Sequence, residues 1–137
     1  MMAALIFVIS VAALLQFFVS YCRSLIASCS KKELSEQARQ VTGIENQHHV
    51  RGDEFARLLQ LVSLCPEPGN DHNKIRAVRA YYRLLNLLRA LLRPLAPAVV
   101  MWAERERAGC AYFAAVTLDY RIAYNQELMA QQMDNRL

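Results

Sequence analysis

The side chains of this sequence that could bind a metal ion are its histidines and cysteines. His48, His49, Cys65 and His72 supply ligand types that zinc prefers. Adjacent histidines cannot both face one ion comfortably, and the spacing of the four residues fits no paired-cysteine or paired-histidine zinc pattern. All three histidines fall in predicted loops. We therefore interpret them as solvated loop residues, and we predict neither a metal nor another cofactor.

Nucleophilic catalysis would need a serine or cysteine beside a base and an orienting group. The sequence holds no Gly-x-Ser-x-Gly turn and no glycine-rich phosphate loop. Glu104 and Glu106 are two residues apart on a predicted helix, so their carboxylates point to different sides. With Arg105 and Arg107 they form an ordinary solvated run of alternating charge. We predict a protein that is not an enzyme and has no small-molecule substrate; a small membrane enzyme or redox-metal protein is the least favoured hypothesis.

The four cysteines could in principle form two disulfides. Cys22 and Cys29 flank a predicted membrane span, whereas Cys65 and Cys110 lie in apolar helical patterns. In a cytoplasmic body, free thiols are the preferred state. Cys22 and Cys29 are seven residues apart and so share a helix face, where palmitoylation is possible in eukaryotes. We favour the interpretation that they are incidental small residues.

A basic segment is the strongest signal outside the amino-terminal stretch. From His72 to Ala103 there are six basic residues and no acid, and Arg76, Arg79 and Arg83 lie on one face of a predicted helix. A cationic amphipathic helix is typical of membrane-surface or partner binding. Alternatively, acids elsewhere, such as Glu104, Glu106 and Asp119, pair with these residues across the body. Nucleic acid is the least favoured partner, because the net charge is only +4 and no aromatic platform accompanies the arginines.

The uncharged stretch Ala3 to Cys22 determines where the rest of the chain, including the basic segment, is located. About twenty apolar residues in a helix cross a hydrocarbon core of roughly 30 Å, which predicts a single transmembrane helix. A cleaved signal peptide and a buried soluble helix are the alternatives, but no basic residue precedes the stretch. Arg23, Lys31 and Lys32 follow it, so the rest of the chain is expected in the cytoplasm. Gln16 places an amide at mid-depth, which a neighbouring spanning helix would explain.

Beyond the anchor, about 115 of the 137 residues remain, enough for one small domain. We expect the anchor to continue as a helical stalk from Arg23 to Val41, with Gly43 as its stop. A polar connector, 44–52, follows. A second helix should begin at Asp53, whose carboxylate favours the positive end of the helix dipole, and should end at Pro66. Its predicted apolar face comprises Phe55, Leu58, Leu59, Val62 and Cys65.

A third helix is expected from about Asp71 to Arg93 and a fourth from about Ala98 to Met133, separated by Pro94 and Pro97. The third helix is apolar nearly all round in its second half, so surplus leucines such as Leu87 and Leu91 need another cover. Small residues in the fourth helix permit close approach of a neighbouring helix, and its tail should project or fray. The predicted core stripe of the third helix is Ile75, Val78, Tyr82, Leu85, Leu88 and Leu92; the fourth helix has an apolar line of Trp102, Phe113, Val116 and Tyr120 and small residues Gly109, Ala111, Ala114 and Ala115.

The sequence thus predicts an all-α protein: a transmembrane anchor (1–22), a juxtamembrane helix and connector (23–50), and a small three-helix extramembrane domain (51–137). The leading hypothesis is a non-catalytic, single-pass accessory or scaffold subunit of a larger membrane complex, in contact with other membrane-protein subunits and with lipid. The alternative is a membrane-tethered module whose basic helix recruits an acidic protein, an anionic lipid or nucleic acid. The residues expected to bind partners are Gln16, Arg76, Arg79, Arg83, Leu87 and Leu91.

Overall fold

Helix is the only regular secondary structure in the residues that the computed structural model describes, 1–44, 51–65, 69 and 71–137. These ranges hold α1 (Met2–Ser30), α2 (Glu36–Thr42), a 3-10 turn η2 (Gly52–Glu54), α3 (Phe55–Leu64), α4 (Asp71–Leu92) and α5 (Pro97–Asp134). The predicted all-α class is confirmed for them. Gly43 ends α2 in the left-handed conformation, at φ 72°, as glycine can at a helix end.

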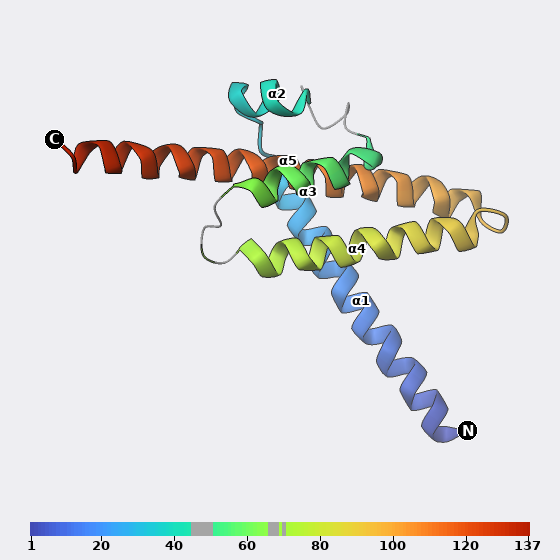
Figure 1. Ribbon diagram of the computed structural model, residues 1–137. Helices are drawn as coiled ribbons and strands as arrows, with labels where there is room; N and C mark the ends of the chain where they lie inside the picture. Colours follow the sequence, from blue (N-terminus) through green and yellow to red (C-terminus); the bar gives the residue numbers. More distant parts are fainter. Residues whose placement is uncertain (45–50, 66–68, 70) are drawn as a thin grey trace.

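The long helix α5 is the axis of the molecule (Figure 1). It contacts α1, α2, α3 and α4, and Ala111–Leu118 is buried at every position because neighbours surround this segment. The predicted apolar line of α5 is wrong at Tyr120, which is 58% exposed because it lies beyond the surrounded segment. Trp102 is half-buried and packs against the core.

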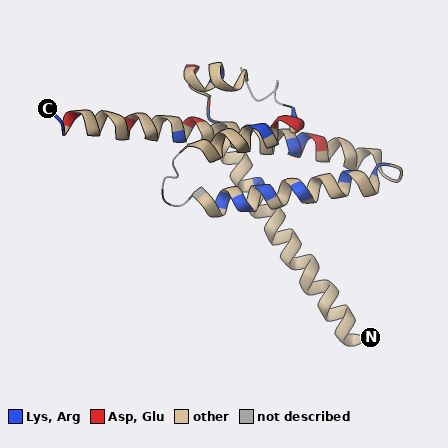
Figure 2. Cartoon of the chain, in the orientation of Figure 1, with Lys and Arg blue, Asp and Glu red and all other residues tan. Residues whose placement is uncertain are grey.

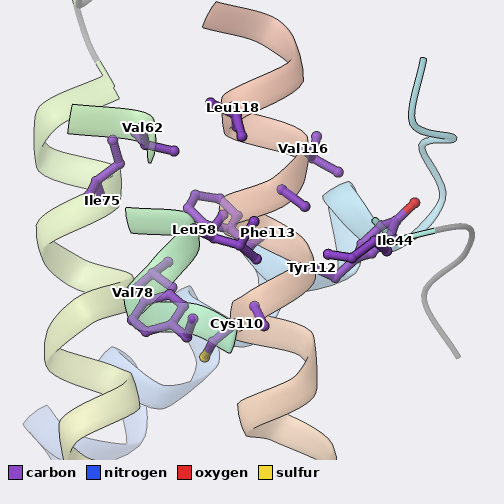
Figure 3. Packing of buried hydrophobic residues seen from close by; sticks show 14 of the residues in the cluster. Ile44, Leu58, Val62, Ile75, Val78, Cys110, Tyr112, Phe113, Val116 and Leu118 are labelled. Atoms are coloured by element: carbon purple, nitrogen blue, oxygen red, sulfur yellow. The ribbon is translucent and has the colours of Figure 1, made fainter. Parts of the chain in front are cut away.

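The hydrophobic core lies where α3 and α4 meet α5 (Figure 3). The predicted face of α3 is confirmed: Phe55, Leu58 and Val62 are buried, and the other two positions are half-buried. In α4 the predicted stripe is wrong at one position, because Tyr81 is fully buried and Tyr82 only partly. Of the remaining stripe residues, Ile75, Val78 and Leu85 are buried, whereas Leu88 and Leu92 are half-buried.

The predicted continuous stalk from Arg23 to Val41 is wrong. The helix α1 ends at Ser30, and α2 is a separate helix whose first turn is capped by the Ser35 hydroxyl. The Asp119 carboxylate of α5 accepts hydrogen bonds from the Ser35 amide at 2.9 Å and from its hydroxyl at 2.6 Å. The Tyr112 hydroxyl donates to the Lys32 carbonyl. These bonds turn the chain onto α5, although its residues have good helix propensity.

The helices α2, α3, α4 and α5 with the turn η2 are called the body. The carboxyl-terminal half of α1 packs against α4 and α5 of this body, and we call this contact the α1 seam. The seam comprises Phe18, Val19, Cys22, Leu25, Ile26 and Cys29. Its closest approach is at Gly109 of α5, where a Cβ atom would lie 2.8 Å from Cγ2 of Ile26. The predicted role of a small residue there is confirmed. The core formed by α3, α4 and α5 is thus completed by α1.

Candidate interaction surfaces

The amino-terminal half of α1 projects from the body, and every residue of Met1–Phe17 is exposed (Figure 1). By length and composition, α1 could cross a membrane between Met2 and Cys29. Gln16 lies on this projecting half. It is one of the residues that line an open groove along α1: Leu15, Gln16, Val19, Ser20, Arg23, Ser24 and Ala27.

The groove runs from the edge of the α1 seam, where Val19 belongs to both, to the side of α1 that faces away from the body. Gln16, Ser20 and Ser24 follow one another at intervals of four residues, so they share one side of the helix. At about 100° per residue, Ser20 lies roughly 160° around the helix from Cys22, which is fully buried in the seam. One side of α1 therefore holds the body, and the opposite side offers an amide flanked by small hydroxyl residues.

A basic face runs along α4, with no acid from His72 onward (Figure 2). Arg76, Arg79 and Arg83 are all exposed. Among the described residues, none of these three arginines forms an ion pair. Their charges therefore face solvent in this structure.

The expected pairing of acids with the basic segment is found at Arg89, one of its six basic residues, and not at Arg76, Arg79 or Arg83. The Glu104 carboxylate meets Arg89 at 2.9 Å. The Glu106 carboxylate lies 3.7 Å from Arg23 of α1, and the Asp119 carboxylate is occupied by Ser35.

Uncovered leucines continue the outer surface of α4 toward its junction with α5. Leu87 is 57% exposed, Leu91 is 61% exposed and Leu95 in the turn is 78% exposed. The chain itself does not cover Leu87 and Leu91, as expected from the nearly continuous leucines of this half-helix. The partner-binding role assigned to them stays a prediction.

Arg107 is buried, although its place in a run of alternating charges predicts a solvated side chain. This prediction is wrong. The Arg107 side chain is 6% exposed, and Nη2 donates to the Asp53 carboxylate at 3.0 Å and to the Tyr82 hydroxyl at 3.1 Å. Nη1 donates to the Glu104 carboxylate at 3.2 Å, and the Tyr82 hydroxyl donates to the Gly52 carbonyl at 2.8 Å. We call this set of residues the Arg107 network. Asp53 thus binds Arg107 and does not cap α3, which begins at Phe55.

The Arg107 network fastens η2 and α4 to α5 without offering a reactive group. Burial lowers the pKa of the Arg107 guanidinium, whereas the hydrogen bonds with Tyr82 and Asp53 raise it. The raising effects are larger together, so the pKa lies above its ordinary value. A pattern in the sequence could have located this residue. Ala103, Arg107, Cys110 and Ala114 recur at helical spacing, and the three others are buried.

A second polar contact is buried between α4 and α5. The Tyr81 hydroxyl donates to the Glu106 carboxylate at 2.9 Å. Burial, and then the Glu106 hydrogen bond and charge, raise the pKa of the Tyr81 hydroxyl far above its ordinary value. Tyr81 therefore keeps its proton at neutral pH and serves as a hydrogen-bond donor.

The metal-binding residue types do not gather in the described part of the chain, which contains no group of three or more such side chains. The predicted loop position of His72 is wrong, because it lies in the first turn of α4. Cys65 and His72 both line a shallow pocket between α3, α4 and α5. His48 and His49 lie outside the described residues, as does Pro66. Cys22 and Cys29 share a helix face as expected, and that face packs into the seam, so Cys22 is fully buried.

The buried thiol of Cys110 gives a test by alkaline titration. Burial, and then the Glu106 charge, raise the pKa of Cys110 far above its ordinary value of 9.0. As pH rises above about 9, the unfolded chain loses this proton while the folded chain keeps it, so unfolding becomes more favourable. We expect the urea concentration at the midpoint of unfolding to decrease as the pH is raised from about 9 to about 11. The fall should be smaller in Cys110→Ala; an equal fall in both proteins would contradict the assignment.

No protein-family model, no curated protein and no solved structure matches this chain.

Proposed function

We propose that this protein is a non-catalytic, single-pass accessory subunit of a larger membrane complex. In this proposal α1 crosses the bilayer and the body lies on the cytoplasmic side, where Arg23, Lys31 and Lys32 favour it. The observation that carries the proposal is the projecting half of α1, which is exposed around its whole circumference and contains Gln16.

An amide in this position calls for a partner outside the chain. Among the described residues, the Gln16 side chain has no hydrogen-bond partner. Lipid chains cannot supply one, and an unsatisfied amide in hydrocarbon is costly. A spanning helix of another subunit can supply one, and Ser20 and Ser24 are small enough to let its backbone approach.

A second candidate function is favoured by the exposed basic face of α4. A membrane-tethered module could use Arg76, Arg79 and Arg83 to recruit an anionic ligand. The two functions are compatible, since they use different helices of the chain.

The accessory-subunit proposal predicts that Gln16→Leu loses its partner proteins. Removing one interhelical hydrogen bond of about 1 to 2 kcal/mol should weaken association roughly tenfold. The full chain and the variant are purified in mild detergent, and stoichiometric co-purifying integral membrane proteins are identified by mass spectrometry. The expected result is their loss from the variant while the helical content is unchanged.

Ser10→Leu is the matched control. It adds the same apolar character to α1, but at about 100° per residue it lies roughly 120° around the helix from Gln16. Ser10→Leu should keep the partners. If Gln16→Leu keeps them too, or if the unaltered chain runs as a lone monomer, α1 is a plain tether and the subunit proposal fails.

A further inference from the structure

The contacts of α1 change in a definite order along its length. Near its carboxyl end, Ile26 packs against Gly109 of α5. One turn earlier, the Cys22 thiol donates to a carbonyl of α4 at 3.6 Å, and the Phe18 ring meets a tyrosine ring of α4 with 6.4 Å between centroids. Before Phe18 the helix is exposed. α4 is therefore the last helix that α1 passes, and it lies on the side from which α1 projects, whereas α2 lies on the other side of α5 (Figure 1).

The part of α1 that could cross a membrane by length and composition, Met2–Cys29, continues past the exposed residues and includes Phe18 and Cys22. Met2–Phe17 is about 24 Å long at a rise of about 1.5 Å per residue. A hydrocarbon core of roughly 30 Å needs about twenty residues, and the uncharged stretch Ala3–Cys22 supplies them, with Phe18 inside it. Since Phe18 contacts α4, a spanning α1 holds α4 at the depth of the lipid headgroups.

The outer face of α4 has the composition of a helix that lies in such an interface. Arg76, Arg83, Leu87 and Leu91 follow one another at spacings of seven, four and four residues, so they form one strip, and all four are exposed. The arginines occupy the first half of the strip and the leucines the half that joins α5. Figure 1 shows the projecting half of α1 leaning toward this leucine end, which is therefore the deeper end.

The charge of this strip matches an anionic leaflet. No acid lies between His72 and Ala103, and Arg76, Arg79 and Arg83 have no ion-pair partner among the described residues. Arginine can extend its apolar stem along lipid while its guanidinium binds phosphate oxygens. Basic residues near an anionic surface are attracted to it.

We propose that α4 is a second membrane contact, with its outer face seated on an anionic bilayer: Leu87 and Leu91 enter the upper acyl region, and Arg76, Arg79 and Arg83 bind lipid phosphates. The inference rests on the proposed anchoring by α1. In this arrangement, two membrane contacts hold the body against the bilayer surface, so the body does not rotate freely about α1. Such a seat would set the height and rotation at which the body meets another subunit.

Tryptophan reporters in the full chain test whether the outer face of α4 contacts the bilayer. The chain has a single tryptophan, so each reporter is placed in a Trp102→Phe background: Leu87→Trp on the outer face of α4, Phe7→Trp on the projecting half of α1, and Val41→Trp on α2. Val41 is a matched control, because it is apolar and 55% exposed, against 57% for Leu87. The proteins are reconstituted into phosphatidylcholine vesicles with or without phosphatidylglycerol, and with acyl chains brominated close to the headgroup, which quench only tryptophans that enter the bilayer.

In anionic vesicles, Leu87→Trp and Phe7→Trp should be quenched and emit at shorter wavelength, whereas Val41→Trp should do neither. Quenching of Leu87→Trp should weaken in neutral vesicles, and also when Arg76, Arg79 and Arg83 are all changed to glutamine; equal quenching in every case would overturn the lipid-phosphate assignment. If Leu87→Trp is unquenched while Phe7→Trp is quenched, α1 enters the membrane but the outer face of α4 does not. The proposed membrane contact of α4 is then overturned, and a protein becomes the ligand to test for this face. If Phe7→Trp is also unquenched, the anchoring on which the proposed function depends fails first.

Discussion

Changing Asp53 and Glu104 together to asparagine and glutamine is expected to destabilise the body by about 3 kcal/mol, more than Arg107→Met does. The reason is the unequal burial of the partners. The Arg107 side chain is 6% exposed, whereas those of Asp53 and Glu104 are 84% and 45% exposed. Removing the carboxylates leaves a positive charge buried without a counter-charge, while removing the arginine leaves two acids that water can solvate. Urea unfolding in detergent, followed by near-ultraviolet circular dichroism, measures both.

The triple variant separates this explanation from a simple loss of hydrogen bonds. With Arg107→Met in place, the two carboxylates have no buried charge to compensate, so changing them as well should cost less than about 1 kcal/mol. The opposite order, with Arg107→Met as the most damaging change, would contradict the argument. It would mean that the bonds of the guanidinium to Tyr82 and the carboxylates outweigh the cost of burying its charge.

The same network shows why the sequence predicts the elements of this fold better than their contacts. Helix positions follow from local chemistry: Gly43 accepts a left-handed conformation, and Pro97 fits the first turn of α5. The break after Ser30 depends on Asp119, a residue distant in sequence, so helix propensity alone predicts one continuous helix. The signal that could have located it is Ser35 followed by Glu36, a typical helix start.

The apolar pattern of α5 fails for a different reason. A helix with one buried side has a 3.6-residue period, but Ala111–Leu118 is buried on all sides and has none. Arg107 was overlooked because its neighbours Glu104 and Glu106 make the segment look solvated. Only the position of η2 beside α5 shows that Asp53 can reach the guanidinium.

For the interaction surfaces, exposure could be predicted and orientation could not. The sequence predicts outside partners for Gln16 and the surplus leucines, and it leaves the α4 arginines open between outside partners and acids of the chain itself. The structure leaves all of these side chains exposed. In the proposed arrangement, the side of the body that faces the membrane depends on how α1 crosses α5 and α4. That crossing depends on Gly109 and Ile26, which are far apart in sequence and carry no charge or motif.

Gly109→Leu is expected to lift α1 from α5 and to lower stability by about 3 kcal/mol, the upper end of the usual cost of overpacking a core. A Cβ at this position would lie 2.8 Å from Cγ2 of Ile26, and a leucine extends further into the seam. Cys22, which is fully buried in the native seam, should then react with maleimide in detergent. Peptide mapping of the labelled protein by mass spectrometry, together with urea unfolding, measures both effects.

The compensating change at Ile26 decides whether contact or helix propensity controls the outcome. In a helix interior without a close neighbour, replacing glycine by alanine is favourable by roughly 0.5 to 1 kcal/mol. In the native chain we expect Gly109→Ala to be unfavourable, because the new methyl group meets Ile26. In an Ile26→Ala background the obstruction is gone, so the same change should become favourable. If Gly109→Ala is favourable in both backgrounds, and Cys22 stays protected in Gly109→Leu, α1 does not approach α5 at Gly109, and the proposed placement of α4 at the bilayer loses the contact on which it depends.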